Sequence, residues 1–305
     1  MVIHMNEHAN SGKKIIEKDW ELLRFLDNFN VLTVSQLSAL SRRSHQVIRR
    51  RLRTLADRGF ISSLHRSYGK KRGRPEDLIL LSMAGWHALY GHDAGNHKRP
   101  RDEKWVTPEF VEHELLLNWF IIHLIQIEWQ RRQLSIHYAT QSFSTAQDIH
   151  SIENIIHIEL AGAKNKLEFI PDGIFSITDL VSKKTLLFFI EVDMGTETLA
   201  SSARGLKDVR QKIVNYQILF RSGQYKRYEQ IFHVRLNGFR LLFITHSHER
   251  HSALCRLVSS MQPSDFIWLT KQDMMFASGL AAKIWSRGGK PENDFESILG
   301  KKMAF

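Results

Sequence analysis

Residues 171–193 read PDGIFSITDLVSKKTLLFFIEVD, and within them five large apolar side chains run from Leu186 to Ile190 without a polar interruption. A short apolar run of this kind is typical of a strand buried on both faces in the middle of a sheet. Glu191 and Asp193 follow the run directly. Because strand side chains alternate, both carboxylates point to one face while Val192 points to the other. The pattern predicts two acids side by side at the end of a central strand.

A third acid, Asp172, stands at the start of the same segment. Neighbouring buried carboxylates persist when they are protonated, paired with cations or bound to a metal. Three oxygen ligands suit Mg²⁺ or Mn²⁺. Simpler interpretations stand beside this one, because Pro-Asp-Gly is a turn signature and acids after a strand are often solvated loop residues. The conjunction of acid, strand, Glu-x-Asp and long helix favours the metal site.

This order resembles the PD-(D/E)XK nuclease superfamily, with Asp193 where the usual motif has lysine. The departure leaves the usual lysine role open, and Lys212 on the following predicted helix could supply the cation. Tyr216 lies one turn beyond Lys212, within the apolar stripe of that helix. We expect Tyr216 to be a packed core residue and not a nucleophile.

The composition indicates a polyanionic partner. The chain has 305 residues, long enough for two domains, and its 43 Lys and Arg against 32 Asp and Glu give a formal charge of +11. A membrane surface could also attract this charge, but we expect no membrane span, and the N-terminus lacks the apolar core of a signal peptide. One cysteine, Cys255, excludes an internal disulfide framework and a cysteine-rich zinc site. The expected compartment is the cytoplasm.

The N-terminal third shows the periodicity of a small helical domain. After a mobile segment, 1–18, we expect helices over 19–29, 33–40 and 44–58. Thr33 and Gln36 form a capping box, Ser44 caps the third helix, and Gly59 ends it. Strands over 60–65 and 77–81 then flank a basic tip, and a short helix runs from 82 to 90. Three helices followed by a hairpin predict a winged helix-turn-helix domain over 19–92.

Basic residues concentrate on the third helix and on the hairpin tip. An exposed row of arginines is often only a solvated helix face. Here the row falls on the helix that would enter a DNA groove, and the adjacent tip adds further cations that could neutralise phosphates. The predicted DNA-binding residues are Arg42, Arg43, Arg49, Arg50, Arg53, Lys70, Lys71, Arg72 and Arg74.

The remaining chain is predicted to form a second domain over 107–305, after a linker over 93–106 that lacks periodicity. A buried core helix spans 107–132, strands follow over 135–141, 152–160, 167–177 and 185–193, and a helix covers 201–221. Strands over 239–245 and 266–269 are each followed by a helix. This order predicts an α/β domain with a mixed sheet flanked by helices.

Several motifs together resemble the replication-relaxation family of plasmid and integrative-element proteins, and the related MobC class of mobilization relaxases. They are the helix-turn-helix, His113-Glu114, Pro171-Asp172, residues 191–197, Lys212 with Tyr216, and Ile284-Trp285. The resemblance implies a restriction-endonuclease-like fold that nicks double-stranded DNA at a transfer origin with Mg²⁺ or Mn²⁺. By that likeness Asp172, Glu191 and Asp193 are metal ligands, and Lys212 joins them as a catalytic residue.

Two functions stay open from the sequence. The first is a metal-dependent endonuclease of relaxase type, with other mobilization or replication proteins as partners. The second is a non-catalytic DNA-binding regulator or replication-accessory protein that keeps the nuclease fold as a scaffold. His246, His248 and His251 could form a histidine metal site, but Ser247 between them is a natural N-cap, which favours surface or capping roles for these residues.

Overall fold

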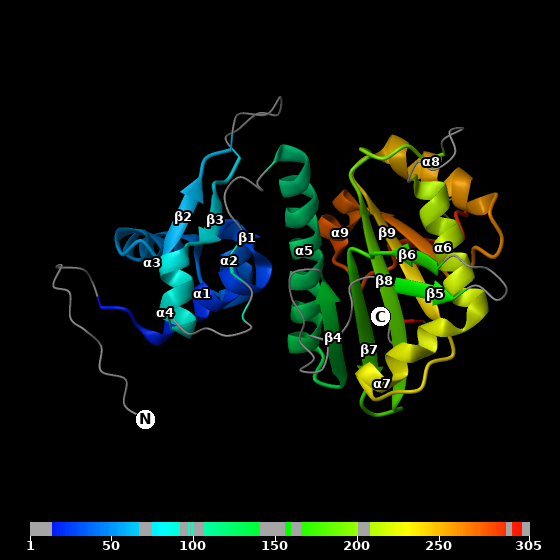
Figure 1. The fold of residues 1–305 in the computed structure, drawn as a ribbon, viewed down its shortest axis with the longest axis horizontal. Coiled ribbons are helices and arrows are strands. Elements are labelled where there is room, and N and C mark those ends of the chain that lie inside the picture. The colour runs from blue at the N-terminus through cyan, green and yellow to red at the C-terminus, as the bar shows by residue number, and fades with distance from the viewer. Residues whose placement is uncertain are drawn as a thin grey trace. The chain divides into compact units, whose positions relative to one another are not determined.

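The structure is a computed structural model, and it describes residues 14–66, 75–91, 97, 99–100, 107–140, 156–159, 166–200, 208–290 and 295–300. The chain forms two compact units, Met1–Val106 and Thr107–Phe305. It is a mixed α/β protein, with helices and a small three-stranded sheet in the first unit and a seven-stranded sheet in the second (Figure 1).

In the described residues of the first unit there are four helices, and three of them begin at a residue whose side chain caps the helix. They are α1 (Glu17–Phe29), α2 (Val34–Ser41), α3 (His45–Asp57) and α4 (Met83–Tyr90). The side chain of Thr33 accepts from the backbone N–H of Gln36 in a capping box, and Ser44 and Ser82 cap α3 and α4 in the same way. Each cap satisfies backbone donors that the helix leaves unpaired. The predicted starts of α2 and α3 are therefore confirmed.

The core of the first unit is closed by apolar stripes on α1 and α3. Leu22 and Leu26 on α1 are fully buried, as are Ile48 and Leu55 on α3. The helix α1 starts at Glu17 and not at the predicted Asp19, two residues earlier. The reason is an acid in the first turn, since the Asp19 carboxylate accepts from the Ile16 N–H at 2.8 Å.

The small sheet has the order β1-β3-β2, with β1 (Val31–Leu32), β2 (Ile61–Leu64) and β3 (Leu78–Leu81). Both pairings are antiparallel. The sequence indicated β2 and β3 but not β1, because two residues are too few to show alternation. The predicted basic tip, with Lys70, Lys71, Arg72 and Arg74, lies outside the described residues.

The second unit is built on one sheet of order β12-β11-β10-β9-β8-β7-β4 (Figure 1). Its strands are β4 (Leu134–Thr140), β7 (Gly173–Asp179), β8 (Lys184–Asp193), β9 (Phe239–Thr245), β10 (Ile267–Lys271), β11 (Trp285–Arg287) and β12 (Phe295–Glu296). The pairs β8–β9 and β9–β10 are parallel, and the others are antiparallel. The predicted central strand is confirmed as β8, which is buried from Leu187 to Asp193.

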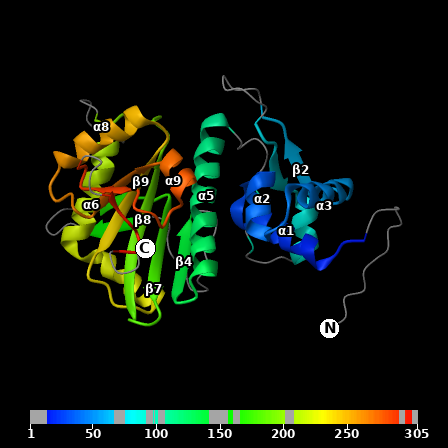
Figure 2. The ribbon, with the colours of Figure 1, turned by 180° about the vertical axis from the view of Figure 1, so that it is seen from behind.

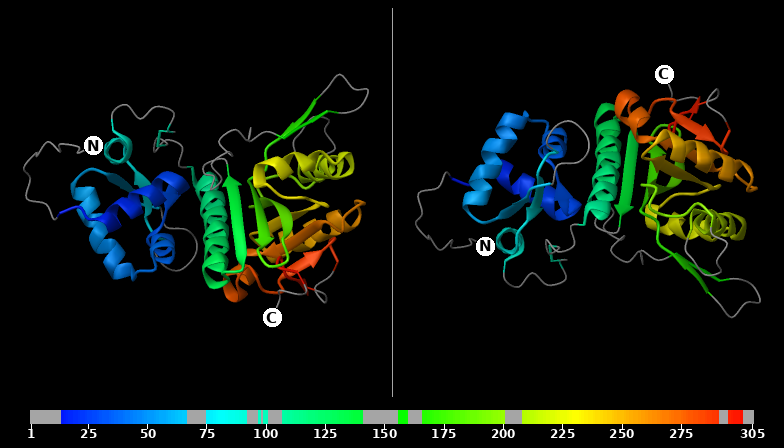
Figure 3. Two further views of the ribbon diagram at one scale, coloured as in Figure 1. Left: turned by 90° about the horizontal axis from the view of Figure 1, so that it is seen from below. Right: turned by 90° about the horizontal axis from the view of Figure 1, so that it is seen from above.

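Helices cover both faces of this sheet, as the two views of Figure 3 show. On one face lie α6 (Val209–Ser222), the short η3 (Gln224–Arg227) and α7 (Tyr228–Phe232), together with α8 (His248–Ser259). Their side chains share a core with Phe189, Leu241 and Leu269 of the sheet. On the other face lie α5 (Pro108–Gln130) and α9 (Gln272–Ser278), visible in the rear view of Figure 2.

The helix α5 begins with Thr107 as its cap and a proline in the first turn, as predicted. Its segment Phe110–Gln130 is long and apolar enough to cross a membrane, and 61% of its most apolar window is buried within the structure. Phe120 of α5 is fully buried and packs edge-on against Phe175 of β7 at a centroid distance of 5.4 Å. The helix packs on the sheet here as a core helix does.

Two segments differ from the expected boundaries. The segment 167–177 divides into β6 (Lys166–Phe169), which pairs with β5 (Ile156–Glu159) in a separate hairpin, and β7, so the sheet strand begins after Asp172. The helix expected from residue 201 begins at Val209, because Asp208 caps it by accepting from the Gln211 N–H at 2.8 Å. Strands β11 and β12 at the sheet edge were not predicted, since both are very short.

Candidate functional site

The predicted acids meet at the carboxyl end of β8. In the antiparallel pairing of β7 with β8, Gly173 stands opposite Ile190, so Asp172 lies beside Glu191 and Val192 of β8. The N–H of Val192 donates to the Asp172 Oδ2 at 2.7 Å. A backbone hydrogen bond thus fixes Asp172 against the end of the central strand, 20 residues further along the chain.

Asp172 also bonds to a histidine from the opposite layer. His113 Nε2 on α5 lies 3.0 Å from the Asp172 Oδ2. Burial alone raises the pKa of Asp172, but the hydrogen bond and charge of His113, with the charge of Lys212, hold that pKa below its usual value. The pKa of His113 is raised in turn, since the pull of Asp172 outweighs the opposite effect of burial. The pair therefore favours a carboxylate facing an imidazolium.

Glu191 is buried at 2% exposure and bonds to two side chains of α6. Tyr216 donates its hydroxyl to Oε1 at 2.6 Å, and Lys212 Nζ lies 3.2 Å from Oε2. Burial and the negative charge of Asp172 raise the pKa of Glu191 to about 7, although Lys212 and Tyr216 act in the other direction. Tyr216 is fully buried and its pKa is raised well above the usual value by burial and by Glu191, which agrees with a packed residue.

Lys212 connects Glu191 to a second acid. Its Nζ also lies 3.1 Å from the Glu197 Oε2 in the loop after β8. Burial alone lowers the pKa of Lys212, but the charges of Glu191, Asp172 and Glu197 raise it above the usual value. The ammonium is therefore held in its charged form at the carboxyl end of β8. The expectation that Lys212 could reach the carboxylates agrees with this geometry.

Asp193 has a different partner. Its Oδ2 accepts from Arg250 Nε at 2.8 Å, and its Oδ1 accepts from the Gly195 N–H at 2.8 Å. Arg250 also donates to the Glu197 carbonyl at 2.6 Å. The parallel register of β8 and β9 explains the pair, because Asp193 stands beside Thr245 and the chain after Thr245 turns into α8, which carries Arg250.

A small cavity of about 80 Å³ lies at this end of the sheet. Its lining includes His113 from α5, Lys212 from α6, Glu191 and Asp193 from β8, and Glu197 from the following loop. Three layers of the unit thus contribute ionisable side chains to one space. Among the described residues no group of three or more His, Cys, Asp and Glu side chains is arranged to hold a metal ion. The structure brings Asp172, Glu191 and Lys212 together, while Asp193 is held by Arg250.

The three histidines near α8 have separate surroundings. Ser247 caps α8 by accepting from the Arg250 N–H at 3.2 Å, as predicted. His246 lies beside the Asp193 carbonyl, His248 lies 3.4 Å from Lys271, and His251 is buried against Cys255 and Ser286. Capping and packing account for these positions.

The predicted DNA-binding arginines of the first unit fall into two groups. Arg49, Arg50 and Arg53 are exposed on α3, as is Arg42 at the end of α2. Arg43 instead pairs with Glu21 at 2.5 Å, and only 18% of its side chain is exposed. Because Arg43 is paired with Glu21 of α1, the arginines that a ligand can reach on α3 are Arg49, Arg50 and Arg53.

Two members of the carboxylate site received no role from the sequence. The sequence pattern includes His113 only as part of the motif His113-Glu114, and it assigns no role to Arg250. A signal for Arg250 does exist, because a cation in the first turn of a helix after a strand parallel to β8 would fall beside Asp193. For His113 no local signal exists, since His113 and Asp172 are 59 residues apart in the chain.

The second unit is a seven-stranded mixed sheet with helices on both faces and an acidic site at the end of its central strand. Residues 23–234 match the sequence model of the Replication-relaxation family. The match covers well over half of the chain, and the protein belongs to this family. Membership suggests a role in the replication or relaxation of plasmid DNA. The only partner that membership implies is DNA. No curated protein and no solved structure matches the chain.

Proposed function

We propose that the protein binds double-stranded DNA of a plasmid or integrative element through its first unit and nicks it with a divalent metal through its second. The observation that carries this proposal is a small cavity lined by Glu191 of β8 and Lys212 of α6, which form an ion pair. Asp172 stands directly behind its lining, bonded to His113 and to the N–H of Val192. A catalytic site needs charged groups held in fixed positions, and here backbone and side-chain hydrogen bonds hold each of them.

The first unit supports the DNA-binding half of the proposal. In our interpretation it is a winged helix-turn-helix domain, with α3 as the recognition helix and β2 and β3 as the flanks of the wing. Arg49, Arg50 and Arg53 are exposed on α3, where they can reach phosphates and base edges. The proposed interface also includes Arg42 and the predicted basic tip with Lys70, Lys71, Arg72 and Arg74, which lies outside the described residues.

The second unit supports the nicking half. We interpret it as a restriction-endonuclease-like domain, in which Lys212 from α6 takes the place of the lysine that Asp193 replaces. Magnesium binds through one or two carboxylates together with waters and substrate phosphates, and the adjacent pair Asp172 and Glu191 fits that requirement. When bound, Mg²⁺ or Mn²⁺ would supply Lewis-acid polarisation of the scissile phosphate and an activated water.

The residues around the pair have roles that follow from their contacts. Lys212 presents a fixed positive charge that would stabilise the phosphorane-like transition state once Glu191 turns to a metal. His113 orients Asp172 and keeps it ionised. Asp193 can act as a third ligand only if it leaves Arg250. Its role in the proposal is therefore conditional on that exchange.

A specific observation favours the second candidate function, a DNA-binding regulator with an inactive nuclease-like domain. Asp172, Glu191 and Asp193 each have a cationic partner from the protein, namely His113, Lys212 and Arg250. Acids balanced in this way can hold layers of a scaffold together without a metal. The two functions differ in whether a metal can compete for these carboxylates.

Supercoiled plasmid carrying the origin of the protein's own element tests the proposal. With Mn²⁺ or Mg²⁺ the wild type should produce open circles, and the metal should raise the melting temperature by binding the folded state alone. Glu191→Gln and Asp172→Asn should lose both effects and retain duplex binding. The exposed Asp273→Asn is the matched control and should retain all three.

Nicking is contradicted if the wild-type protein still binds duplex DNA in a gel shift but shows two further results. Its melting temperature does not rise in millimolar Mn²⁺, and the plasmid stays supercoiled. That result would select the regulator.

A further inference from the structure

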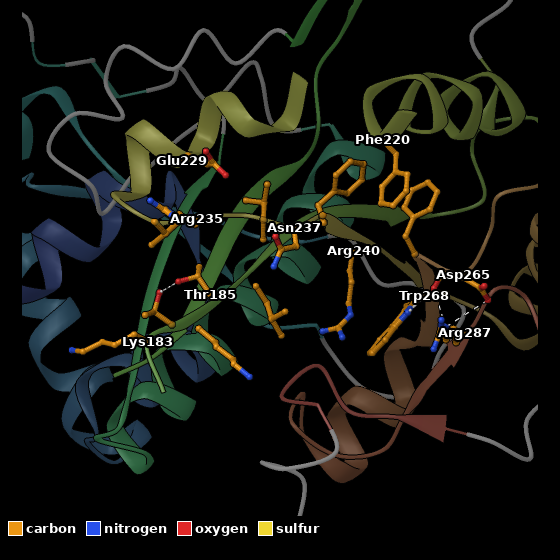
Figure 4. Close-up of a pocket in the computed structure, with 18 of the residues that line it drawn as sticks. Lys183, Thr185, Phe220, Glu229, Arg235, Asn237, Arg240, Asp265, Trp268 and Arg287 are labelled. Carbon is orange, nitrogen blue, oxygen red and sulfur yellow. Dashed lines mark hydrogen bonds and ion pairs between the residues drawn. The ribbon is translucent and has the colours of Figure 1, made fainter. Parts of the chain in front are cut away.

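A second, larger site lies at the opposite end of β8 and β9 from the carboxylates. It is a groove of about 1270 Å³, lined by the start of β8, the loop before β9, and segments near β10 and β11 (Figure 4). Its volume exceeds the usual range of about 300–1,000 Å³ for small-ligand pockets. An open space of this size suits an extended ligand.

The groove carries an excess of positive charge. Its cationic lining consists of Lys183, Lys184, Arg235, Arg240 and Arg287, and its acids are Glu229 and Asp265. Both acids already have partners, since Glu229 accepts from the Leu236 N–H at 2.7 Å and Asp265 lies 3.6 Å from Arg287. Lys183 and Arg235 are exposed, and Figure 4 shows them across the groove from Arg240 and Arg287.

Arg240 is the recessed cation of this groove. Its guanidinium carbon lies 4.3 Å from the ring centroid of Trp268 and 5.7 Å from that of Phe188, so two buried rings fix its position. Within the described part of the chain, its buried NH1 atom has no hydrogen-bond partner. A buried donor of this kind costs free energy unless a ligand or water satisfies it.

The charge of Arg240 is also poorly balanced. Burial and the neighbouring Arg287 lower the pKa of Arg240, and Glu296 offsets this only in part. An arginine nevertheless stays protonated in proteins, so burying this charged guanidinium destabilises the folded state. A bound anion would relieve it, and the planar fork of arginine matches the oxygens of a phosphate.

We propose that this groove binds the phosphodiester backbone of single-stranded DNA. A flexible strand can bring a phosphate down to the recessed Arg240, while a duplex is stiff at this scale and presents its phosphates on a broad convex surface. Phe220, half-buried and stacked on Phe266 at 4.6 Å, provides an aromatic wall beside the cations. A basic groove with a nearby ring is the usual composition of single-strand sites.

The inference goes beyond the proposed nicking function and does not depend on it. The groove and the carboxylates lie at opposite ends of the same strands, since β8 runs from Lys184 to Asp193. A strand held in the groove would be positioned by contacts that no residue of the carboxylate site makes.

The test is anisotropy of a labelled 20-nucleotide oligo(dT), measured with the full-length chain over a series of salt concentrations. Arg49, Arg50 and Arg53 are replaced by alanine throughout, so that α3 does not mask the groove. Lys183→Glu with Arg235→Glu should then weaken binding about tenfold, at roughly threefold for each lost phosphate contact. The slope of log K against log salt should fall by about 0.7 for each contact.

Arg240→Gln tests the recessed guanidinium and should weaken binding at least threefold, roughly the value of one contact. Because Lys183 and Arg235 are exposed, their double variant decides the question even if Arg240→Gln does not fold. Lys283→Glu with Arg256→Glu is the matched control, since both are exposed cations outside the groove lining. This control should stay within twofold of its parent.

Two results would overturn the proposal. In the first, the groove variants and the control variant change the affinity for oligo(dT) by the same factor. The other is unchanged oligo(dT) binding with weakened binding of polyglutamate, which would assign the groove to an acidic protein segment. Plasmid nicking and duplex shifts by the groove variants are read separately. Their loss or retention therefore distinguishes a failure of the groove from a failure of the nicking function.

Discussion

The arginines on α3 in the first unit and the acids at the end of β8 in the second unit lie in different surroundings. In the first unit Arg49, Arg50 and Arg53 stand exposed on α3, while Arg51, on the same helix, forms an ion pair with the fully buried Asp19. In the second unit the acids at the end of β8 are buried and each has a cation from another element. Exposed charge of one sign suits contact with a large polyanion, and buried balanced charge suits local chemistry or local structure.

The difference shows that residue type alone does not separate binding charge from structural charge. Arg50 and Arg51 are adjacent on α3, yet one is exposed and the other ties α3 to α1. The helix period places them on different faces. A change at a buried pair should therefore affect stability, and a change in the exposed row should affect binding.

The largest expected effect comes from breaking the buried pair of the first unit. Asp19→Ala should destabilise that unit by about 3–5 kcal/mol, because it leaves Arg51 without its partner and removes the bond to the Ile16 N–H. Chemical denaturation followed by the helical circular dichroism signal measures this. Glu17→Ala is the control, since its pair with Arg24 is exposed and is worth less than about 1 kcal/mol. Equal effects of the two would contradict the assignment of Asp19 to the core.

A smaller effect is expected from the pH dependence of the second unit without metal. The pKa of Glu191 is raised from 4.5 to about 7, so the folded state binds more protons than the unfolded state between these values. The contribution of Glu191 to the free energy of unfolding is therefore fully present below pH 4.5 and is lost as the pH rises toward 7. Because one pKa unit corresponds to about 1.4 kcal/mol, the loss is of order 3 kcal/mol.

Glu191→Gln should remove this part of the pH dependence of stability. In the window from pH 4.5 to 6.5 the lowered pKa of Asp172, which acts below 3.8, and the raised pKa of His113, which acts above 6.5, do not contribute. The lowered pKa of His123 and the raised pKa of Asp27 also act in this window, but wild type and variant share both, so the difference between the two proteins reports on Glu191. Urea unfolding in EDTA across that window measures the difference between wild type and variant. Parallel curves for the two proteins would show that Glu191 is already ionised at pH 4.5.

The smallest expected effect in free energy concerns the exposed row. Replacing Arg49, Arg50 and Arg53 with alanine should weaken duplex binding roughly 30-fold, or about 2 kcal/mol, at about threefold for each phosphate contact. The melting temperature should stay nearly unchanged, because exposed side chains contribute little to stability. Arg24→Ala, on α1, is the control. Gel shifts that stay within twofold for the triple variant would remove α3 from the DNA interface.

Local signals were sufficient for much of the fold. The capping residues Thr33 and Ser44 and the apolar run before Glu191 gave correct element types, and the bounds predicted for β9, Phe239–Thr245, agree with the structure. These features depend on neighbours within a few residues. The helix α6 begins later than predicted, at Val209, because the sequence before Asp208 continues the helical pattern while Asp208 caps the helix.

The sequence by itself determined that acids would stand at the end of β8, because strand alternation and a buried apolar run are local properties. Only the tertiary structure decided which cation each acid receives. Asp193 meets Arg250 across 57 residues through the parallel register of β8 and β9, and Glu191 meets Lys212 because α6 packs over the same face. Sequence separations of this length carry no local pattern, so the partners are set by how the elements pack.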